Sequence, residues 1–102
     1  MPTYETMTRF NNDLDRLTPE QRRRFRRAVN AFVHDLRDAN GHFRAGLRVK
    51  QVSGFPGIYE LTWSAGTGPA GRATWQYGEP IRQGTPHVIW RRIGTHTILT
   101  GP

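Results

Sequence analysis

The chain has 102 residues, a length that suits one domain, so residues 1–102 are treated as a single unit. Its 15 basic and 8 acidic residues give a net charge of +7, which favours a polyanion or an acidic protein segment as partner. The chain has no cysteine, which excludes disulfides, thiol nucleophiles and thiolate metal sites and fits a cytoplasmic protein. No apolar run approaches the ~20 residues that a membrane-spanning helix needs.

The first third of the chain is expected to be helical, after a short extended segment at Thr3–Met7. Phe10, Leu14 and Leu17 recur at i, i+4 and i+7, which is the spacing of one helix face. This spacing predicts a first amphipathic helix.

A second helix is predicted to start at Thr18-Pro19-Glu20-Gln21. The threonine can cap the helix, proline fits the first helical position, and glutamine can reach back as in a capping box. The helix should run to about Arg37, and Asn40-Gly41 should end it.

Four β-like segments separated by Gly- and Pro-rich turns follow, namely Leu47–Val52, Ile58–Trp63, Arg72–Tyr77 and His87–Ile93. Short strands with short links favour an antiparallel meander. The predicted fold class is α+β, with a short N-terminal strand and a helical hairpin packed on one face of a four- to five-stranded antiparallel sheet. Alternation along the first segment is broken, so a bulge is expected there.

Alternation also predicts which strand residues face away from the helices. The apolar rows belong against the helices, so the outward row is expected to hold Glu60, Thr62, Arg72, Thr74 and Gln76. The last strand is ambiguous, because Arg91 shares its parity with Ile89 and Ile93. We assign Trp90 and Arg92 to the open face.

The excess of positive charge lies mostly in the sheet half, where residues 43–102 carry +5 against +2 for residues 1–42. The densest run is Arg22, Arg23, Arg24, Arg26 and Arg27 on the second helix. This run has two interpretations, a patch that follows RNA phosphates or the solvated side of an amphipathic helix.

The order of elements resembles the RelE/ParE superfamily of bacterial toxin–antitoxin pairs. Leu47-Arg48-Val49-Lys50, followed by Gly54-Phe55-Pro56-Gly57-Ile58-Tyr59-Glu60-Leu61, looks like the family's central hairpin. Gly71-Arg72-Ala73-Thr74-Trp75 resembles the next strand, and Gly94-Thr95-His96 looks like the ending of the branch that includes YafQ. The resemblance covers nearly the whole chain.

The resemblance implies a ribosome-dependent mRNA endonuclease that works without a metal or cofactor, through attack of the RNA 2′-hydroxyl on the adjacent phosphate. His96 matches the family's histidine and is the expected general acid or base, since an imidazole titrates near neutral pH. Arg72 matches the arginine that holds the scissile phosphate, and Arg92 is expected to assist it. The expected RNA-binding residues are Arg48, Lys50, Trp90, Glu60 and His42.

Two departures from the family pattern bear on this interpretation. Some members place lysines where this chain has Glu60 and Thr62, so Glu60 is either a base or a surface residue. Relatives often carry an aromatic or acidic residue shortly after the histidine, and Thr97–Thr100 contains neither. Of the other histidines, His34 is expected to be a surface residue and His87 to be structural, and the four show no tight spacing for zinc.

Two other classes of function stay open. A ParE-like toxin would share the fold, bind DNA gyrase and cut no RNA, and a nucleic-acid-binding module would have no catalytic histidine. His96 with Arg72 and Arg92 favours the nuclease, because binding a protein requires no acid–base histidine. Partners expected for the nuclease are a cognate antitoxin, the ribosome and mRNA.

Overall fold

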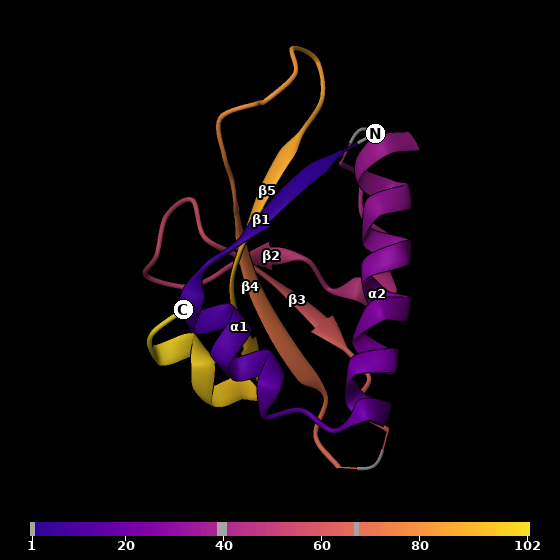
Figure 1. Cartoon of the computed structure of the whole chain (residues 1–102), viewed down its shortest axis with the longest axis vertical. Helices are drawn as coiled ribbons and strands as arrows, with labels where there is room; N and C mark the ends of the chain where they lie inside the picture. The colour runs from indigo at the N-terminus through magenta and orange to yellow at the C-terminus, as the bar shows by residue number, and fades with distance from the viewer. Residues whose placement is uncertain (1, 39–40, 67) are drawn as a thin grey trace.

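The computed structural model describes residues 2–38, 41–66 and 68–102 as a curved five-stranded sheet with helices around it (Figure 1). The strands are β1 (Thr3–Thr6), β2 (Lys50–Gln51), β3 (Tyr59–Trp63), β4 (Gly71–Tyr77) and β5 (His87–Gly94). Their order in the sheet is β1-β5-β4-β3-β2, antiparallel except for the parallel pair of β1 and β5. The predicted α+β fold is therefore confirmed, with one parallel pair that the sequence had not indicated.

The two helices form the expected hairpin, α1 (Thr8–Asp15) and α2 (Pro19–Asp38). The capping box is present: Gln21 N donates to Thr18 Oγ1 at 3.1 Å, and Thr18 N donates to Gln21 Oε1 at 2.9 Å. The helix continues one residue past the predicted Arg37, and Asn40, predicted to end it, lies outside the described residues.

The core lies between α2 and one face of the sheet and is mostly aromatic. Phe32 and Trp75 are almost fully buried with ring centroids 4.9 Å apart, and Phe10 of α1 joins them through Phe25 at 6.1 Å. Offset and edge-to-face pairs such as these add about 1 kcal/mol each to the burial of their apolar area. Of the rows predicted to face the helices, Leu61, Trp63, Ala73 and Trp75 are buried as expected, whereas Tyr59 is only partly buried and Tyr77 is exposed.

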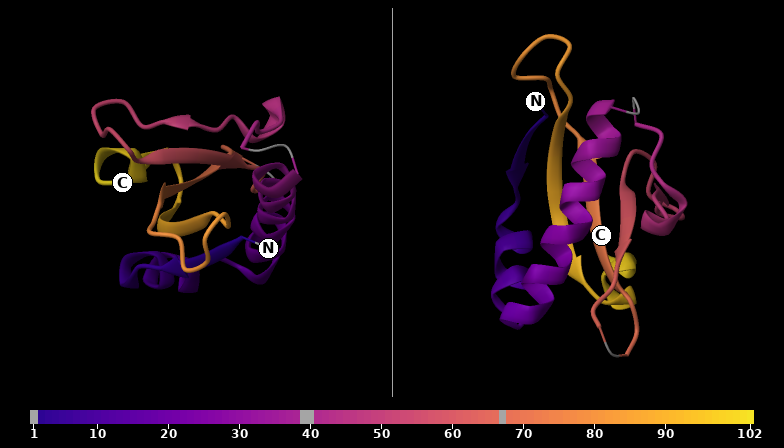
Figure 2. Two further views of the ribbon diagram at one scale, coloured as in Figure 1. Left: turned by 90° about the horizontal axis from the view of Figure 1, so that it is seen from above. Right: turned by 90° about the vertical axis from the view of Figure 1, so that its right-hand side faces the viewer.

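A short C-terminal 3₁₀ helix, η2 (His96–Thr100), lies on the opposite face of the sheet from α2 (Figure 2). It contacts β4 and β5, and Ile98 and Pro102 are buried. The prediction of an open outer face is therefore wrong for its centre, where Glu60 and Thr74 are 5% and 0% exposed.

The segment predicted as a strand at Leu47–Val52 is mostly irregular. A 3₁₀ turn, η1 (Ala45–Leu47), occupies its start, and only Lys50–Gln51 pair with β3. Leu47 and Val52 are both buried, although in a regular strand residues five positions apart would point to opposite faces. The broken alternation in the sequence reflects this turn.

Candidate functional site

Charged and polar side chains form a row across four strands on the outer face of the sheet. Opposite residues in antiparallel strands place their side chains on one face. The register pairs Lys50 with Glu60, Glu60 with Thr74, and Thr74 with Arg92. A neighbouring row pairs Thr62 with Arg72 and Arg72 with Gly94. Four of the eight residues that the sequence predicted for the site, Lys50, Glu60, Arg72 and Arg92, thus lie in these rows.

Glu60 and Arg72 occupy adjacent rows and form the centre of this surface. Arg72 Nε lies 3.6 Å from Glu60 Oε1, and the two side chains are 20% and 6% exposed. Arg72 Nη1 donates to the carbonyl oxygen of Gly71 at 3.2 Å, whereas the buried Nε has no hydrogen-bond partner within the described residues. The ion pair is therefore loose, and it leaves donors of the guanidinium available for an anion.

His96 lies at the point where the chain leaves the sheet next to Arg72. Gly94 is the register partner of Arg72, and His96 follows it by two residues as the exposed first residue of η2. The far end of this segment is fixed: Arg9 Nη2 donates to the Gly101 carbonyl at 2.8 Å, and Arg91 Nη2 donates to the Pro102 carbonyl at 3.2 Å. The histidine thus sits on a short segment fixed on both sides.

Arg92 is already engaged within the fold. Its Nε and Nη2 donate to the two carboxylate oxygens of Asp13, each at 2.9 Å, and the backbone N–H of Ile93 donates to the same carboxylate at 3.2 Å. Burial alone would raise the pKa of Asp13, but the hydrogen bonds from Arg92 and Ile93 outweigh it and lower that pKa. Of the three guanidinium nitrogens of Arg92, Nη1 alone makes no hydrogen bond within the described part of the chain. It is therefore the nitrogen that could donate to a substrate.

The placement of Trp90 on the open face was wrong. Trp90 is 5% exposed and its ring packs in the core, 5.2 Å from that of Phe32. An irregularity in the pairing of β4 with β5 explains the error: Trp75 pairs with Trp90 but Thr74 pairs with Arg92. This extra residue in β5 shifts the alternation, so Trp90 faces the core and cannot stack on a base.

The same irregularity brings to the outer face a residue that sequence reasoning had not used. Arg91 binds the side chain of Gln76 and the carbonyl oxygen of Pro102. Its conflict of parity with Ile89 and Ile93 was the signal in the sequence that could have found it. Arg91 therefore belongs to the surface that Arg72 and Glu60 define.

The remaining predicted RNA-binding residues lie toward the β2 end of the sheet. Lys50 is exposed in the polar row, and Arg48 is exposed just before it with a left-handed backbone at φ 49°. His42 is exposed in the segment between α2 and η1. The register brings Lys50 into the row with Glu60, whereas Arg48 and His42 stand outside it.

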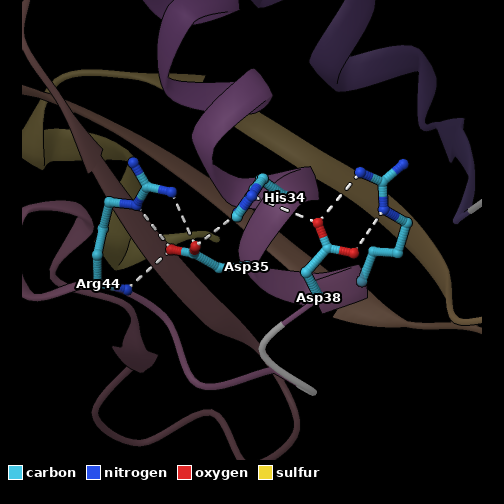
Figure 3. A network of polar contacts seen from close by, with 5 residues as sticks. His34, Asp35, Asp38 and Arg44 are labelled. Atoms are coloured by element: carbon cyan, nitrogen blue, oxygen red, sulfur yellow. Dashed lines mark hydrogen bonds and ion pairs between the residues drawn. The ribbon is translucent and has the colours of Figure 1, made fainter.

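The segment that carries His42 is tied to α2 by a buried carboxylate (Figure 3). Asp35 accepts hydrogen bonds from Arg44 Nε and Nη2 at 2.8 Å and from the Arg44 backbone N–H at 2.9 Å. These bonds hold the pKa of Asp35 well below its ordinary value. His34, predicted to be a surface residue, lies exposed beside Asp35 and Asp38, with Nδ1 3.4 Å from Asp35 Oδ1.

His87 is buried at the other edge of the sheet, away from the polar row. Its Nδ1 lies 2.7 Å from Thr3 Oγ1 and its Nε2 lies 2.9 Å from Glu5 Oε1. Both ring nitrogens are therefore occupied in fastening β1 to β5, which agrees with the predicted structural role.

Within the described residues, no cluster of three or more histidine or acidic side chains is arranged to hold a metal ion. In the same part of the chain, no helix has the length and apolar character needed to cross a membrane.

Comparisons with known proteins found no match, so the functional interpretation depends on the residues of this chain alone. No protein-family model matches the chain, and it matches no curated protein and no solved structure.

Proposed function

We propose that this protein is a RelE-like toxin, a metal-independent endoribonuclease that cleaves mRNA in the ribosome and so inhibits translation. The observation that carries the proposal is the pair of Arg72 and Glu60 beside the strand end that leads to His96. Cleavage by 2′-hydroxyl attack requires a base, an acid and a cation near the phosphate, and a carboxylate, an imidazole and a guanidinium can supply these three functions.

Each group has a role in the proposed reaction. Glu60 accepts the proton of the 2′-hydroxyl as its oxygen attacks phosphorus, and Arg72 stabilises the charge that develops on the phosphate oxygens. The bond from phosphorus to the 5′-oxygen breaks, and His96 donates the proton that this leaving oxygen takes up. The products are a 2′,3′-cyclic phosphate and a free 5′-hydroxyl.

The surrounding basic residues are proposed to hold the RNA. Lys50, in the row, and Arg48, just before it in the chain, are exposed and suit contacts with neighbouring phosphates, as does the exposed His42. Arg92 adds the donors of Nη1, since its other nitrogens bind Asp13. A cognate antitoxin, the ribosome and a cytoplasmic location belong to the same proposal.

One observation favours the alternative, a ParE-like toxin that binds DNA gyrase without cutting RNA. Arg72 and Arg92 each have a carboxylate neighbour inside the fold, Glu60 and Asp13 respectively, as structural arginines do. In this alternative, the charged row only shapes a protein-binding surface.

Induction of the wild-type chain and of single variants, followed by mapping of mRNA 5′ ends, separates the two functions. We expect cuts within translated codons with the wild type and with the control His34→Ala, whose histidine is exposed on α2. His96→Ala and Glu60→Gln should abolish the cuts while the proteins remain folded. Growth arrest without any cuts, unchanged in His96→Ala, would overturn the nuclease and lead to gyrase supercoiling assays.

A further inference from the structure

An apolar groove is lined by residues of β1, α1, α2 and β5. Figure 1 shows how α2 runs beside β1 and α1. The volume of the groove is about 480 Å³. The floor is made of hydrophobic side chains from α1, α2 and β5, among them Phe10, Leu14, Val29, Val33, Val88 and Trp90. The groove shares no residue with the polar row on the outer face of the sheet.

The groove exists because the apolar stripe of α2 is wider than the surface that covers it. Phe25, Phe32 and Leu36 are buried against the sheet, whereas Val29 and Val33 are only partly buried. The companion helix α1 has eight residues and cannot accompany the twenty residues of α2. Val29 and Val33 therefore leave part of their apolar surface accessible along the groove.

The groove is basic at one end. Arg22 and Arg26, near the start of α2, line it, and none of its sixteen lining residues is acidic. Arg26 is exposed and forms no ion pair within the described residues. The lining on α2 extends from Arg22 to Leu36, fourteen residues further along the helix, which is a distance of about 21 Å.

We propose that this groove binds an amphipathic helical segment of a partner protein, with acidic residues grouped at one end. Apolar side chains at i, i+3, i+4 and i+7 would fill the floor, and the carboxylates would face Arg22 and Arg26. A long apolar floor with only two cations fits such a peptide better than RNA, whose phosphates need a continuous line of cations. The proposed nuclease function does not say where a partner protein binds, and the groove supplies such a surface. Binding there requires none of the proposed catalytic residues.

The test is titration of the full chain with a designed helical peptide of about 14 residues, which carries leucines at that spacing and four glutamates at one end. We expect saturable binding. Tryptophan fluorescence should report it, because Trp90 lines the groove. Arg26→Glu should weaken binding about fivefold, as the loss of a rim ion pair does. The matched control Arg27→Glu, exposed on α2 but outside the groove, should change it less than about twofold.

Two further measurements make the inference falsifiable. A peptide with lysines in place of the glutamates should bind Arg26→Glu better than it binds the wild type. Val33→Asp should abolish binding of the acidic peptide, whereas Asn30→Asp on the exposed side of α2 should not, with thermal unfolding used to verify that both variants fold. Equal effects of Arg26→Glu and Arg27→Glu, no saturable binding, or displacement of the peptide by a short RNA would overturn the proposal. His96→Ala should bind the peptide like the wild type, so failure of the nuclease and failure of the groove give different results.

Discussion

Arg92 and Asp13, 79 residues apart in the chain, form a two-pronged ion pair that joins β5 to α1, with Nε···Oδ2 and Nη2···Oδ1 both at 2.9 Å. The same carboxylate accepts the backbone N–H of Ile93, at the part of β5 that continues beyond its pairing with β1. Asp13 therefore supplies an acceptor to a strand edge that β1 does not reach. The pair closes the sheet edge and orients a guanidinium on the outer face.

Replacing Asp13 should destabilise the fold more than its place on a short helix would indicate. Asp13→Asn leaves the Arg92 cation without its counter-charge, and we expect a loss of roughly 2–3 kcal/mol in the free energy of unfolding. Urea denaturation monitored by tryptophan fluorescence measures it. The control Asp15→Asn, exposed on the same helix, should stay within about 0.5 kcal/mol of the wild type. Equal stability of the two variants would refute a structural role for the pair.

The stability of the fold should fall in acid because of Asp35. The hydrogen bonds from Arg44 lower the pKa of Asp35 in the folded chain, so the unfolded chain binds a proton more readily. The resulting stabilisation is present above the ordinary pKa of an aspartate, about 4, and is lost as the pH falls toward the lower folded value. Denaturation between pH 7 and pH 2 should therefore show a shallower pH dependence for Asp35→Asn than for the wild type or Asp15→Asn. An unchanged slope would contradict this assignment.

Much of the fold followed from local signals in the sequence. The capping box at Thr18 and Gln21 and the alternation in β3 and β4 each depend on residues close in the chain. The parallel pairing of β1 with β5 could not be predicted in this way, because it joins residues more than 80 positions apart.

The candidate site was less predictable, because strict alternation fails where a strand gains a residue. The irregularity opposite Thr74 and Trp75 turned Trp90 into the core and brought Arg91 outward. The coverage of Thr74 by the C-terminal segment also depends on tertiary contacts of Arg9 and Arg91. Glu60 and Arg72, on regular strands, lie on the predicted face of the sheet, although Glu60 is buried there and not open to solvent.

Arg72 is expected to contribute through the geometry of its guanidinium as well as its charge. Arg72→Lys keeps a cation but loses the fork of donors that matches two phosphate oxygens, so we expect kcat for cleavage of ribosome-bound mRNA to fall about 100-fold. Arg82→Lys, in an exposed loop, serves as the control and should leave kcat unchanged. Full activity of Arg72→Lys would mean that a point charge suffices and that the guanidinium geometry has no catalytic role.

Arg91 is expected to act by positioning His96. The short segment from His96 to Pro102 is held by Arg91 at its end and by the burial of Ile98 in its middle, so its backbone is anchored two residues after the register partner of Arg72. Arg91→Ala removes the donors to the Pro102 carbonyl and should lower kcat about tenfold with little change in KM, because a misplaced catalytic group costs rate without weakening substrate binding. Amide hydrogen exchange of the C-terminal segment should increase in the same variant and stay unchanged in Arg82→Ala. Faster exchange with normal kcat would show that the segment is held by Arg91 but that its order is not needed for cleavage.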